Sequence, residues 1–247
     1  MLILISNDDG ILSEGLLSLA AALKPLGDIW IVAPEKAQSA VGRSITLHRP
    51  LKMTRLSDQK FMINGTPSDC VNLAINSLLP QKPALVVSGI NKGGNMADDI
   101  PYSGTVAAAF EATIWKIPAL AVSLACRNNF IFGPAARFTA KVASALLKNS
   151  LAPDIFLNVN VPDTQGKEIT AYKITHQGKS VYEETIEERT NPRGEKYYWI
   201  GGDGTKYKDI PGSDADAVLK NYASITPVKT DFTDHGALGA LKKWTII

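Results

Sequence analysis

The chain opens with Leu2-Ile3-Leu4-Ile5-Ser6-Asn7-Asp8-Asp9-Gly10, an apolar run that gives way at once to polar residues. The apolar side chains are consecutive and do not alternate with polar ones, which predicts a strand buried on both faces. Parallel strands that helices cover on both sides have this pattern. Further runs of this kind occur at Asp28 to Ala33, Ala84 to Ser88, Ala119 to Leu124 and Ile155 to Val161. The chain is therefore expected to contain a parallel sheet.

Helical patterns separate many of these strands. Two segments place apolar residues at the i, i+3, i+4, i+7 spacing of one helix face. The first set is Leu16, Leu19, Ala20 and Leu23, and the second is Val71, Ala74, Ile75 and Leu78. Thr66 and Pro67 suit the N-cap and the first position of the second helix. Further helices are expected from about Val106 and over Ala135 to Lys148. Alternating strands and helices predict an open, mostly parallel α/β sheet.

After Pro162 the pattern changes to strands with no helices between them. Ile169 to His176, Val181 to Arg189 and Glu195 to Gly201 are expected strands, and Asn191-Pro192-Arg193-Gly194 predicts a turn between the last two. A hairpin this long is expected to leave the parallel core as a β arm. The segments that follow are an expected helix at Asp214 to Tyr222, a strand at Ala223 to Val228 and a terminal helix at Gly236 to Trp244. We expect one domain over residues 1–247, with a core at about 1–165 and 214–247 and an arm at about 169–202.

The composition describes a globular chain without a strong charge. The 247 residues are 45% hydrophobic, which is enough to bury a sizeable core, and the formal net charge is +2. This near balance predicts no strong electrostatic attraction to nucleic acid or to an anionic membrane. Two cysteines, Cys70 and Cys126, do not make a disulfide framework, and the N-terminal apolar run is too short for a membrane span. We therefore expect a cytoplasmic protein.

Asn7-Asp8-Asp9-Gly10 directly follows the first expected strand and is the sharpest chemical feature of the chain. In open α/β sheets, ligands bind outside the carboxyl ends of the strands. Two adjacent carboxylates repel each other there, and a divalent cation would offset that cost. Oxygen ligands suit Mg²⁺, Mn²⁺ or Ca²⁺ better than soft metals. The alternative interpretation is a polar strand-to-loop turn in which an aspartate caps the next helix.

A second group of candidate residues follows the strand at Ala84 to Ser88. The segment from Gly89 to Asn95 contains glycines that let the backbone approach a ligand, and Asn91 and Asn95 offer amide groups to a metal or a phosphate. Tyr102-Ser103-Gly104-Thr105-Val106 then opens a helix, where backbone N–H groups and hydroxyls form an anion site. The alternative is a flexible loop followed by an ordinary Ser or Thr cap.

The loop after the strand at Asp28 to Ala33 adds two weaker candidates. Ser39 offers a hydroxyl that would complete a coordination shell, and Arg43 is a candidate phosphate clamp. A turn serine and a solvated arginine are the plainer alternatives. Of the three histidines only His235, near the C-terminus, stays open as a catalytic candidate.

Several other enzyme classes lack their motifs in this sequence. Gly178-Lys179-Ser180 resembles the end of a P-loop, but Lys173 stands where that motif requires a glycine. No G-x-G-x-x-G follows the first strand, and the spacing of the histidines gives no local zinc motif. A Ser-His-Asp hydrolase also lacks its G-x-S-x-G elbow.

Taken together, these residues resemble the SurE family, the stationary-phase survival proteins that act as 5'-nucleotidases. The matching segments run in order along nearly the whole chain. They are Ile5 to Gly10, Val32 to Pro34, Gln38 to Ala40, Gly65 to Val71, Ser88 to Asn95, Tyr102 to Ala108, Gly194 to Trp199 and Ser224 to Pro227. Two departures are mild: Asn221 stands where the family commonly has Gly, and residues 202–213 are irregular. Both departures lie outside the metal motifs.

The resemblance implies a Rossmann-like core whose β arm exchanges between subunits to give a homodimer or homotetramer. It also implies one divalent cation per subunit, Mg²⁺ or Mn²⁺, held by Asp8, Asp9, Ser39 and Asn91. The phosphate of the substrate is expected near Asn95 and Ser103-Gly104-Thr105. The expected reaction is metal-assisted hydrolysis of nucleoside 5'-monophosphates, in which Asp8 or Asp9 orients or deprotonates the attacking water. No membrane and no stable nucleic-acid complex is expected.

Two rival functions share part of this site. An aspartyl-phosphate phosphatase, as in the haloacid-dehalogenase-like enzymes, needs Asp-x-Asp, whereas Asp8 and Asp9 are adjacent. A nucleotide sensor that binds monophosphates without turnover needs the same residues as the enzyme, so a measured rate separates the two.

Overall fold

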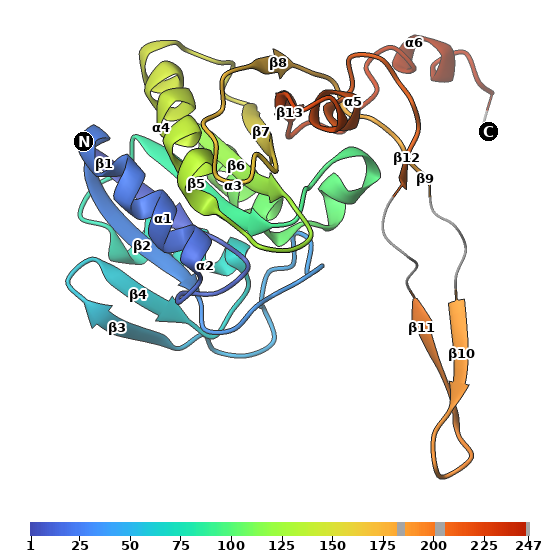
Figure 1. Cartoon of the computed structure of the whole chain (residues 1–247), viewed down its shortest axis with the longest axis horizontal. Helices are drawn as coiled ribbons and strands as arrows, with labels where there is room; N and C mark the ends of the chain where they lie inside the picture. The colour runs from blue at the N-terminus through green and yellow to red at the C-terminus, as the bar shows by residue number, and fades with distance from the viewer. Residues whose placement is uncertain (182–185, 201–205, 246–247) are drawn as a thin grey trace.

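The apolar run at the start of the chain forms β1 (Leu2–Ser6), a fully buried strand. In the computed structural model, which describes residues 1–181, 186–200 and 206–245, β1 lies inside one sheet of nine described strands. The strand order is β3-β4-β2-β1-β5-β6-β7-β13-β8. β1 pairs in parallel with β2 on one side and with β5 on the other, so the direction in which the chain builds the sheet reverses at β1 (Figure 1).

The expected buried strands are confirmed, with small differences at their ends. The other strands of the sheet are β2 (Asp28–Pro34), β3 (Met53–Ser57), β4 (Lys60–Ile63), β5 (Leu85–Lys92), β6 (Ala119–Ala125), β7 (Ile155–Pro162), β8 (Tyr172–Ile174) and β13 (Ala223–Lys229). Two short antiparallel pairs lie outside the sheet. They are β9 (Ser180–Val181) with β12 (Lys206–Tyr207), and β10 (Ile186–Thr190) with β11 (Lys196–Ile200).

Helices cover both faces of the sheet (Figure 1). The α-helices are α1 (Glu14–Leu23), α2 (Pro67–Leu73), α3 (Gly104–Ile114), α4 (Phe132–Lys148), α5 (Asp214–Leu219) and α6 (Leu238–Leu241). Short helices of other types are η1 (Lys24–Leu26), η2 (Ala74–Leu78) and η3 (Ala97–Tyr102). Among these described helices, none is long and apolar enough to cross a membrane.

The core has two halves, one on each face. Ile3 and Ile5 point into the half that α1 and α4 cover, whereas Leu4 points into the half that α2 and α3 cover. Successive side chains of a strand face opposite sides, so both faces can be apolar only if the strand sequence is continuously apolar. Burying each such side chain contributes about 1.5–3 kcal/mol relative to leaving it exposed.

Side-chain caps begin the helices that matter for the site. The Ser13 side chain accepts the Leu16 N–H at the start of α1, and Thr66 forms a capping box with Asp69 at the start of α2. The expected cap at Thr66 is therefore confirmed. Ser103 caps α3 by accepting the Val106 N–H at 3.2 Å. A cap that satisfies one early N–H leaves the remaining first N–H groups of the helix available to a ligand.

The arm begins later than the sequence suggested. Only Tyr172–Ile174 of the expected strand at Ile169 to His176 is a strand, and it pairs in parallel with β13 inside the main sheet, with Tyr172 opposite Ala223. Placing it in the arm was wrong, because the pairing joins segments about fifty residues apart that carry no local signal. The described arm is the hairpin β10–β11, which turns at the expected residues 191–194 and stands away from the body (Figure 1).

Other differences lie at exposed elements. The β3–β4 hairpin was not expected, because Met53–Ser57 is an edge strand with four exposed residues and so has no apolar run. The terminal helix, expected over Gly236 to Trp244, is only α6. The expected strands at Val181 to Arg189 and Glu195 to Gly201 extend into residues 182–185 and 201, which lie outside the described residues.

Candidate active site

Asp8 and Asp9 follow β1 at its carboxyl end, next to the point where the direction of sheet building reverses. A crevice forms at such a point because the connections from neighbouring strands leave toward opposite faces. Asn91 lies near the end of β5, the parallel neighbour of β1. The Lys92 N–H donates to Asp9 Oδ2 at 3.2 Å. Asp9 and the segment of Asn91 are therefore brought together, as the sequence predicted.

The first turn of α3 lies against Asp8. The Thr105 hydroxyl donates to Asp8 Oδ1 at 2.5 Å, and both residues are buried. Gly104 is so close that a Cβ atom placed on it would lie 2.8 Å from Asp8 Cβ and 3.0 Å from Asp8 Oδ2. Glycine is therefore the residue that lets the helix start approach the carboxyl group. The predicted metal residues and the predicted phosphate residues meet at this contact.

The two aspartates hold their charges at a cost. Burial raises the pKa of Asp8 above its usual value; the Thr105 hydrogen bond lowers that pKa in part, and the charge of Asp9 raises it again. Burial also raises the pKa of Asp9. The hydrogen bond from the Lys92 N–H and the positive charge of the Lys92 side chain lower that pKa in part. A cation bound to both carboxylates would offset the desolvation and the repulsion together.

The loop of Ser39 joins the same edge of the sheet. The N–H of Gln38 donates to the backbone oxygen of Asp8 at 2.7 Å, and Ser39 is the next residue, exposed to solvent. Further along the loop, the Gly42 N–H donates to the Tyr102 oxygen at 3.0 Å, just before the helix cap at Ser103. These two bonds tie the loop to the end of β1 and to the residue that precedes the cap of α3.

Asn95 is held by the ends of two strands. Its N–H donates to Asn160 Oδ1 at 2.8 Å, and its backbone oxygen accepts from the side-chain amides of Asn158 at 2.8 Å and Asn160 at 3.0 Å. The Asn95 side-chain amide donates to Ser123 Oγ at 2.7 Å. These bonds fix Asn95 against β6 and β7, on the same edge of the sheet as Asp8.

The family model described as survival protein SurE matches residues 3–184. The chain belongs to the SurE family. It is 50% identical over 247 residues to "5'-nucleotidase SurE" of Geotalea uraniireducens (strain Rf4), with 100% of each chain covered. It is 49% identical over 246 residues to the protein of the same name from Myxococcus xanthus (strain DK1622), covering 99% of this chain and 93% of that one.

A solved structure supports the fold directly. The crystal structure of SurE protein from Aquifex aeolicus superimposes with a TM-score of 0.88 at 37% sequence identity, covering 98% of each chain. The resemblance to the SurE family and the expected Rossmann-like, mostly parallel α/β fold with a C-terminal hairpin are thereby confirmed.

The donors at the SurE site fit a hard divalent cation. Within residues 1–181, 186–200 and 206–245, no three His, Cys, Asp or Glu side chains gather into a group that could hold a metal. A cation beside Asp8 and Asp9 therefore needs neutral oxygens to complete its ligands. Asn91 can supply such an oxygen. Its side-chain nitrogen donates to the Gly93 oxygen at 2.9 Å, which leaves the side-chain oxygen as an acceptor. Carboxylate, amide and hydroxyl oxygens suit Mg²⁺ and Mn²⁺.

Arg43, the candidate phosphate clamp, packs against two aromatic rings. Its guanidinium carbon lies 4.4 Å from the centre of the Phe110 ring and 4.5 Å from that of the Phe232 ring. Both distances are those of cation–π contacts. The cation thus binds aromatic rings of α3 and of the segment that follows β13.

Sequence reasoning missed the residues that hold Asn95. Asn158 and Asn160 stand in β7, and both are fully buried, as is Ser123 in β6. A signal was present, since asparagines inside an otherwise apolar buried strand need polar partners. The pattern could not say which segment supplies those partners, because Asn95 is more than sixty residues away.

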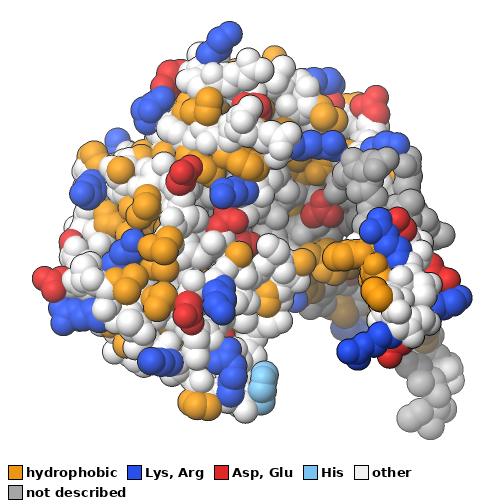
Figure 2. Space-filling view, turned by 60° about the horizontal axis from the view of Figure 1, so that its bottom comes forward, with side chains coloured by type: hydrophobic (Ala, Val, Ile, Leu, Met, Phe, Trp, Pro, Cys, Tyr) orange, Lys and Arg blue, Asp and Glu red, His pale blue; other side chains and the backbone are white. Residues whose placement is uncertain are grey.

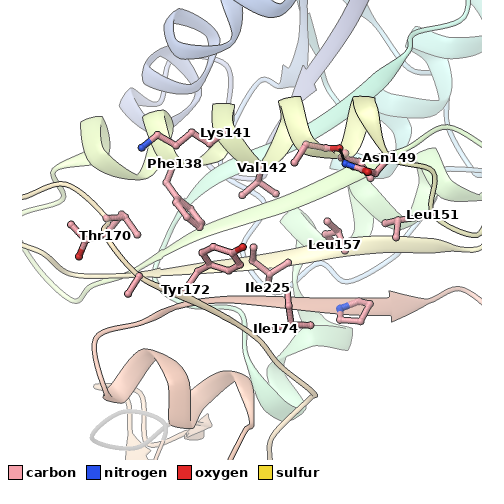
Figure 3. Close-up of a pocket in the computed structure, with 15 residues that line it drawn as sticks. Phe138, Lys141, Val142, Asn149, Leu151, Leu157, Thr170, Tyr172, Ile174 and Ile225 are labelled. Atoms are coloured by element: carbon pink, nitrogen blue, oxygen red, sulfur yellow. Dashed lines mark hydrogen bonds between the residues drawn. The ribbon is translucent and has the colours of Figure 1, made fainter.

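A large apolar cavity lies elsewhere in the SurE fold. It has a volume of about 590 Å³, and Phe138 and Val142 of α4 face Tyr172, Leu157 and Ile225 of the sheet across it (Figure 3). None of the predicted site residues lines it. No Asp or Glu is among its lining residues, whereas Asp8 and Asp9 supply the pair of carboxylates that phosphoryl chemistry needs. The chemistry of the side chains, and not the size of the cavity, places the candidate site.

The surface charge agrees with a local site. On the face shown in Figure 2, acidic and basic side chains are mixed and no large field of one sign appears. An anionic substrate must then be attracted by groups at the candidate site itself, because the net charge of +2 supplies little long-range steering.

Proposed function

We propose that this SurE family member is a metal-dependent 5'-nucleotidase, which hydrolyses nucleoside 5'-monophosphates to nucleosides and inorganic phosphate. One observation carries the proposal: the carboxyl group of Asp8 touches Thr105 and Gly104 at the start of α3. A dicarboxylate site for a cation and a helix N-terminus for an anion therefore lie next to each other, as a phosphomonoester bound to a cation requires. The relatives named 5'-nucleotidase support the choice of substrate.

In this proposal each subunit holds one divalent cation, Mg²⁺ or Mn²⁺. Its ligands are Asp8, Asp9, Ser39 and Asn91. When bound, the cation neutralises charge on the phosphoryl oxygens and lowers the pKa of a coordinated water. On the other side of the crevice, Asn95, Ser103, Gly104 and Thr105 hold the phosphate, with the first N–H groups of α3 directed at its oxygens.

Asp9 is the better candidate to hold and deprotonate the attacking water. Asp8 is buried, and one of its oxygens already accepts from Thr105. Asp9 is only partly buried, and the bond from the Lys92 N–H occupies one of its oxygens. The water oxygen then attacks phosphorus, the bond from phosphorus to the 5'-oxygen breaks, and a proton passes to that oxygen as the nucleoside leaves.

Release of inorganic phosphate is the direct test. The purified chain should release phosphate from AMP or GMP in the presence of Mn²⁺ or Mg²⁺, and a chelator should abolish the release. Binding of monophosphates without release of phosphate, across a panel of nucleotides, would favour the sensor function. An acid quench that traps phosphate on Asp8 or Asp9 would instead favour the aspartyl-phosphate mechanism over direct attack by water.

We also propose that the chain forms a homodimer or homotetramer by exchange of its arm. The hairpin β10–β11 exposes Ile186, Tyr198, Trp199 and Ile200, with exposed fractions of 56% or more. An isolated two-stranded hairpin is marginal in water, so a covering partner would stabilise it. A second copy can supply that cover symmetrically, because each copy gives and receives the same arm.

A cytoplasmic location completes the proposal. Cys70 and Cys126 are both free thiols, as suits a reducing compartment. Burial raises the pKa of the Cys70 thiol well above its usual value, so this cysteine stays protonated and unreactive. Fractionation of the native host cells, with detection of the chain in the soluble cytoplasmic fraction, tests the location.

A further inference from the structure

The segment from Asn95 to Thr105 carries both groups of proposed phosphate contacts. Asn95 stands at one end, and Ser103, Gly104 and Thr105 stand at the other. Between them runs η3 (Ala97–Tyr102), a short 3₁₀ turn. The distance between the two groups of contacts therefore depends on how Ala97 and its neighbours are held.

Asp214 holds this segment from outside. It is fully buried at the start of α5, and its Oδ2 accepts the Ala97 N–H at 2.9 Å. Its Oδ1 accepts the N–H groups of Gly178 at 2.9 Å and of Ala215 at 2.8 Å. One buried side chain thus joins three separate parts of the chain: the phosphate segment, the connection that leads to the arm, and α5.

The connection to the arm, residues 177–180, forms hydrogen bonds with Ala97 and with its neighbour Asp98. The Gln177 side chain donates to the Ala97 oxygen at 2.9 Å. The Ser180 N–H donates to Asp98 Oδ2 at 3.0 Å, and Lys179 Nζ lies 2.8 Å from Asp98 Oδ1. Ala97 has a φ of 53°, a backbone conformation that costs an alanine free energy unless its surroundings hold it.

Apolar packing adds to these polar bonds. Met96, the residue between Asn95 and Ala97, is buried against Ala215 and Val218 of α5. The helix α5 therefore contacts the phosphate segment through apolar side chains as well as through the carboxyl group of Asp214.

We propose that Asp214 is a positioning residue for the phosphate side of the site, and that it couples this side to the root of the arm. The inference rests on the proposed function of Asn95 and of residues 103–105 as phosphate contacts. Asp214 touches neither Asp8 nor Asp9 in its described bonds, so its removal should loosen the phosphate and leave the metal in place.

Asp214→Asn tests the proposal with the full chain. An asparagine keeps one oxygen acceptor but turns the other into an NH₂ donor, which meets a backbone N–H. We expect the Kd for inorganic phosphate, measured by calorimetry with saturating Mn²⁺, to rise about tenfold, as loss of a hydrogen bond to a charged group implies. The KM for AMP should rise in parallel. The Kd for Mn²⁺ itself should equal that of the parent.

Asp216→Asn is the matched control. Asp216 stands two residues along the same helix, and its side chain accepts from the Gly212 N–H at 3.1 Å and pairs with Lys220 at 2.5 Å. The control variant loses similar bonds at the two ends of α5 but leaves the hydrogen bond from the Ala97 N–H to Asp214 intact. It should lower the melting temperature while keeping the parent affinity for phosphate. An equal loss of phosphate affinity in both variants would reduce Asp214 to a residue that merely stabilises α5 and would overturn the proposal.

Gln177→Ala keeps the proposal testable if Asp214→Asn does not fold. This change removes the bond to the Ala97 oxygen and leaves Asp214 intact, so it should weaken phosphate binding in the same direction by a smaller factor. Parent phosphate affinity in every folded variant overturns the inference. The proposed function fails separately, through absence of phosphate release by the parent, because calorimetry with inorganic phosphate needs no turnover.

Discussion

The hydroxyl of Thr105 donates a hydrogen bond of 2.5 Å to Oδ1 of Asp8, a residue 97 positions earlier in the chain. This bond joins the carboxyl end of β1 to the first turn of α3. It also links the two sides of the proposed site, because Asp8 is a proposed ligand of the cation and Thr105 a proposed contact of the phosphate. A change to Thr105 or to Asp8 that breaks this bond should therefore affect both the cation and the phosphate.

Asp8→Asn and Asp9→Asn should each abolish metal-dependent phosphate release while leaving the fold intact. Each change removes a charged ligand at the end of a strand, where little core packing is lost. In Asp8→Asn the remaining side-chain oxygen can still accept the Thr105 bond. Calorimetry with Mn²⁺ and a phosphate-release assay on the folded variants check this prediction. Parent levels of binding and activity in both variants would remove the cation from this edge of the sheet.

The metal-free protein should change its stability with pH in a way that Asp8→Asn removes. The pKa of Asp8 is raised above its usual 3.8 by burial, so the folded state holds this proton more tightly than the unfolded state does. The resulting stabilisation is complete below the unfolded pKa and is lost as pH rises through the folded pKa. With a chelator present, Asp8→Asn should therefore melt higher than the parent at neutral pH.

Below the unfolded-state pKa of Asp8, about 3.8, the difference between the two melting temperatures should vanish. Comparing variant with parent cancels the contributions of the acidic groups that do not interact with Asp8, because both proteins share them. Excess Mn²⁺ should reverse the order at neutral pH, since the parent gains stability from binding and the variant does not. A variant that melts below the parent at neutral pH in chelator would mean that the Asp8 carboxylate stabilises the empty site.

Thr105→Val should act on both sides of the site. It removes the bond that lowers the pKa of Asp8, so metal binding should need a higher pH than in the parent. It also removes a hydroxyl from the phosphate side, and the KM for AMP should rise even with saturating metal. Thr105→Ser keeps the hydroxyl and is the control. If Thr105→Val matches the parent in the pH dependence of Mn²⁺ binding, the bond to Asp8 has no influence on the metal.

Asn91→Ala should weaken metal binding less than either aspartate change. The side-chain oxygen of Asn91 is a neutral ligand, and its loss leaves both carboxylates in place. We expect a rise of about tenfold in the Kd for Mn²⁺, with activity restored by excess metal. A loss of binding as complete as in Asp9→Asn would show that Asn91 also holds the strand end in place.

Local sequence patterns were sufficient for the centre of the fold and for the position of two candidate site residues. The continuous apolar runs identified the buried parallel strands, because covering both faces requires apolar residues at consecutive positions. Asp8 and Asp9 were found for a related reason: charged residues directly after a buried strand fall at the edge where parallel sheets bind ligands.

The parts that sequence could not supply depend on contacts between distant segments. β8 was placed in the arm because its pairing with β13 has no local signature. The polar shell of Asn95, with Asn158 and Asn160, and the anchor at Asp214 were missed for the same reason. A buried asparagine or aspartate in the sequence predicts that the side chain has hydrogen-bond partners, but only the folded chain shows which residues they are.

Removing the hairpin tests the proposed arm exchange. Replacing Ile186–Ile200 with a short Gly-Ser bridge should yield a monomer, because the hairpin carries the exposed side chains Ile186, Tyr198, Trp199 and Ile200. The deletion keeps the hydrogen bonds from Gln177 to Ala97 and from Ser180 to Asp98. The affinities for Mn²⁺ and for inorganic phosphate should therefore stay near parent values. Trp199→Ala with Ile200→Ala is the milder comparison and should weaken the assembly without shortening the chain. Light scattering decides the outcome, since a full-length chain that is monomeric at micromolar concentration would rule out exchange of the arm.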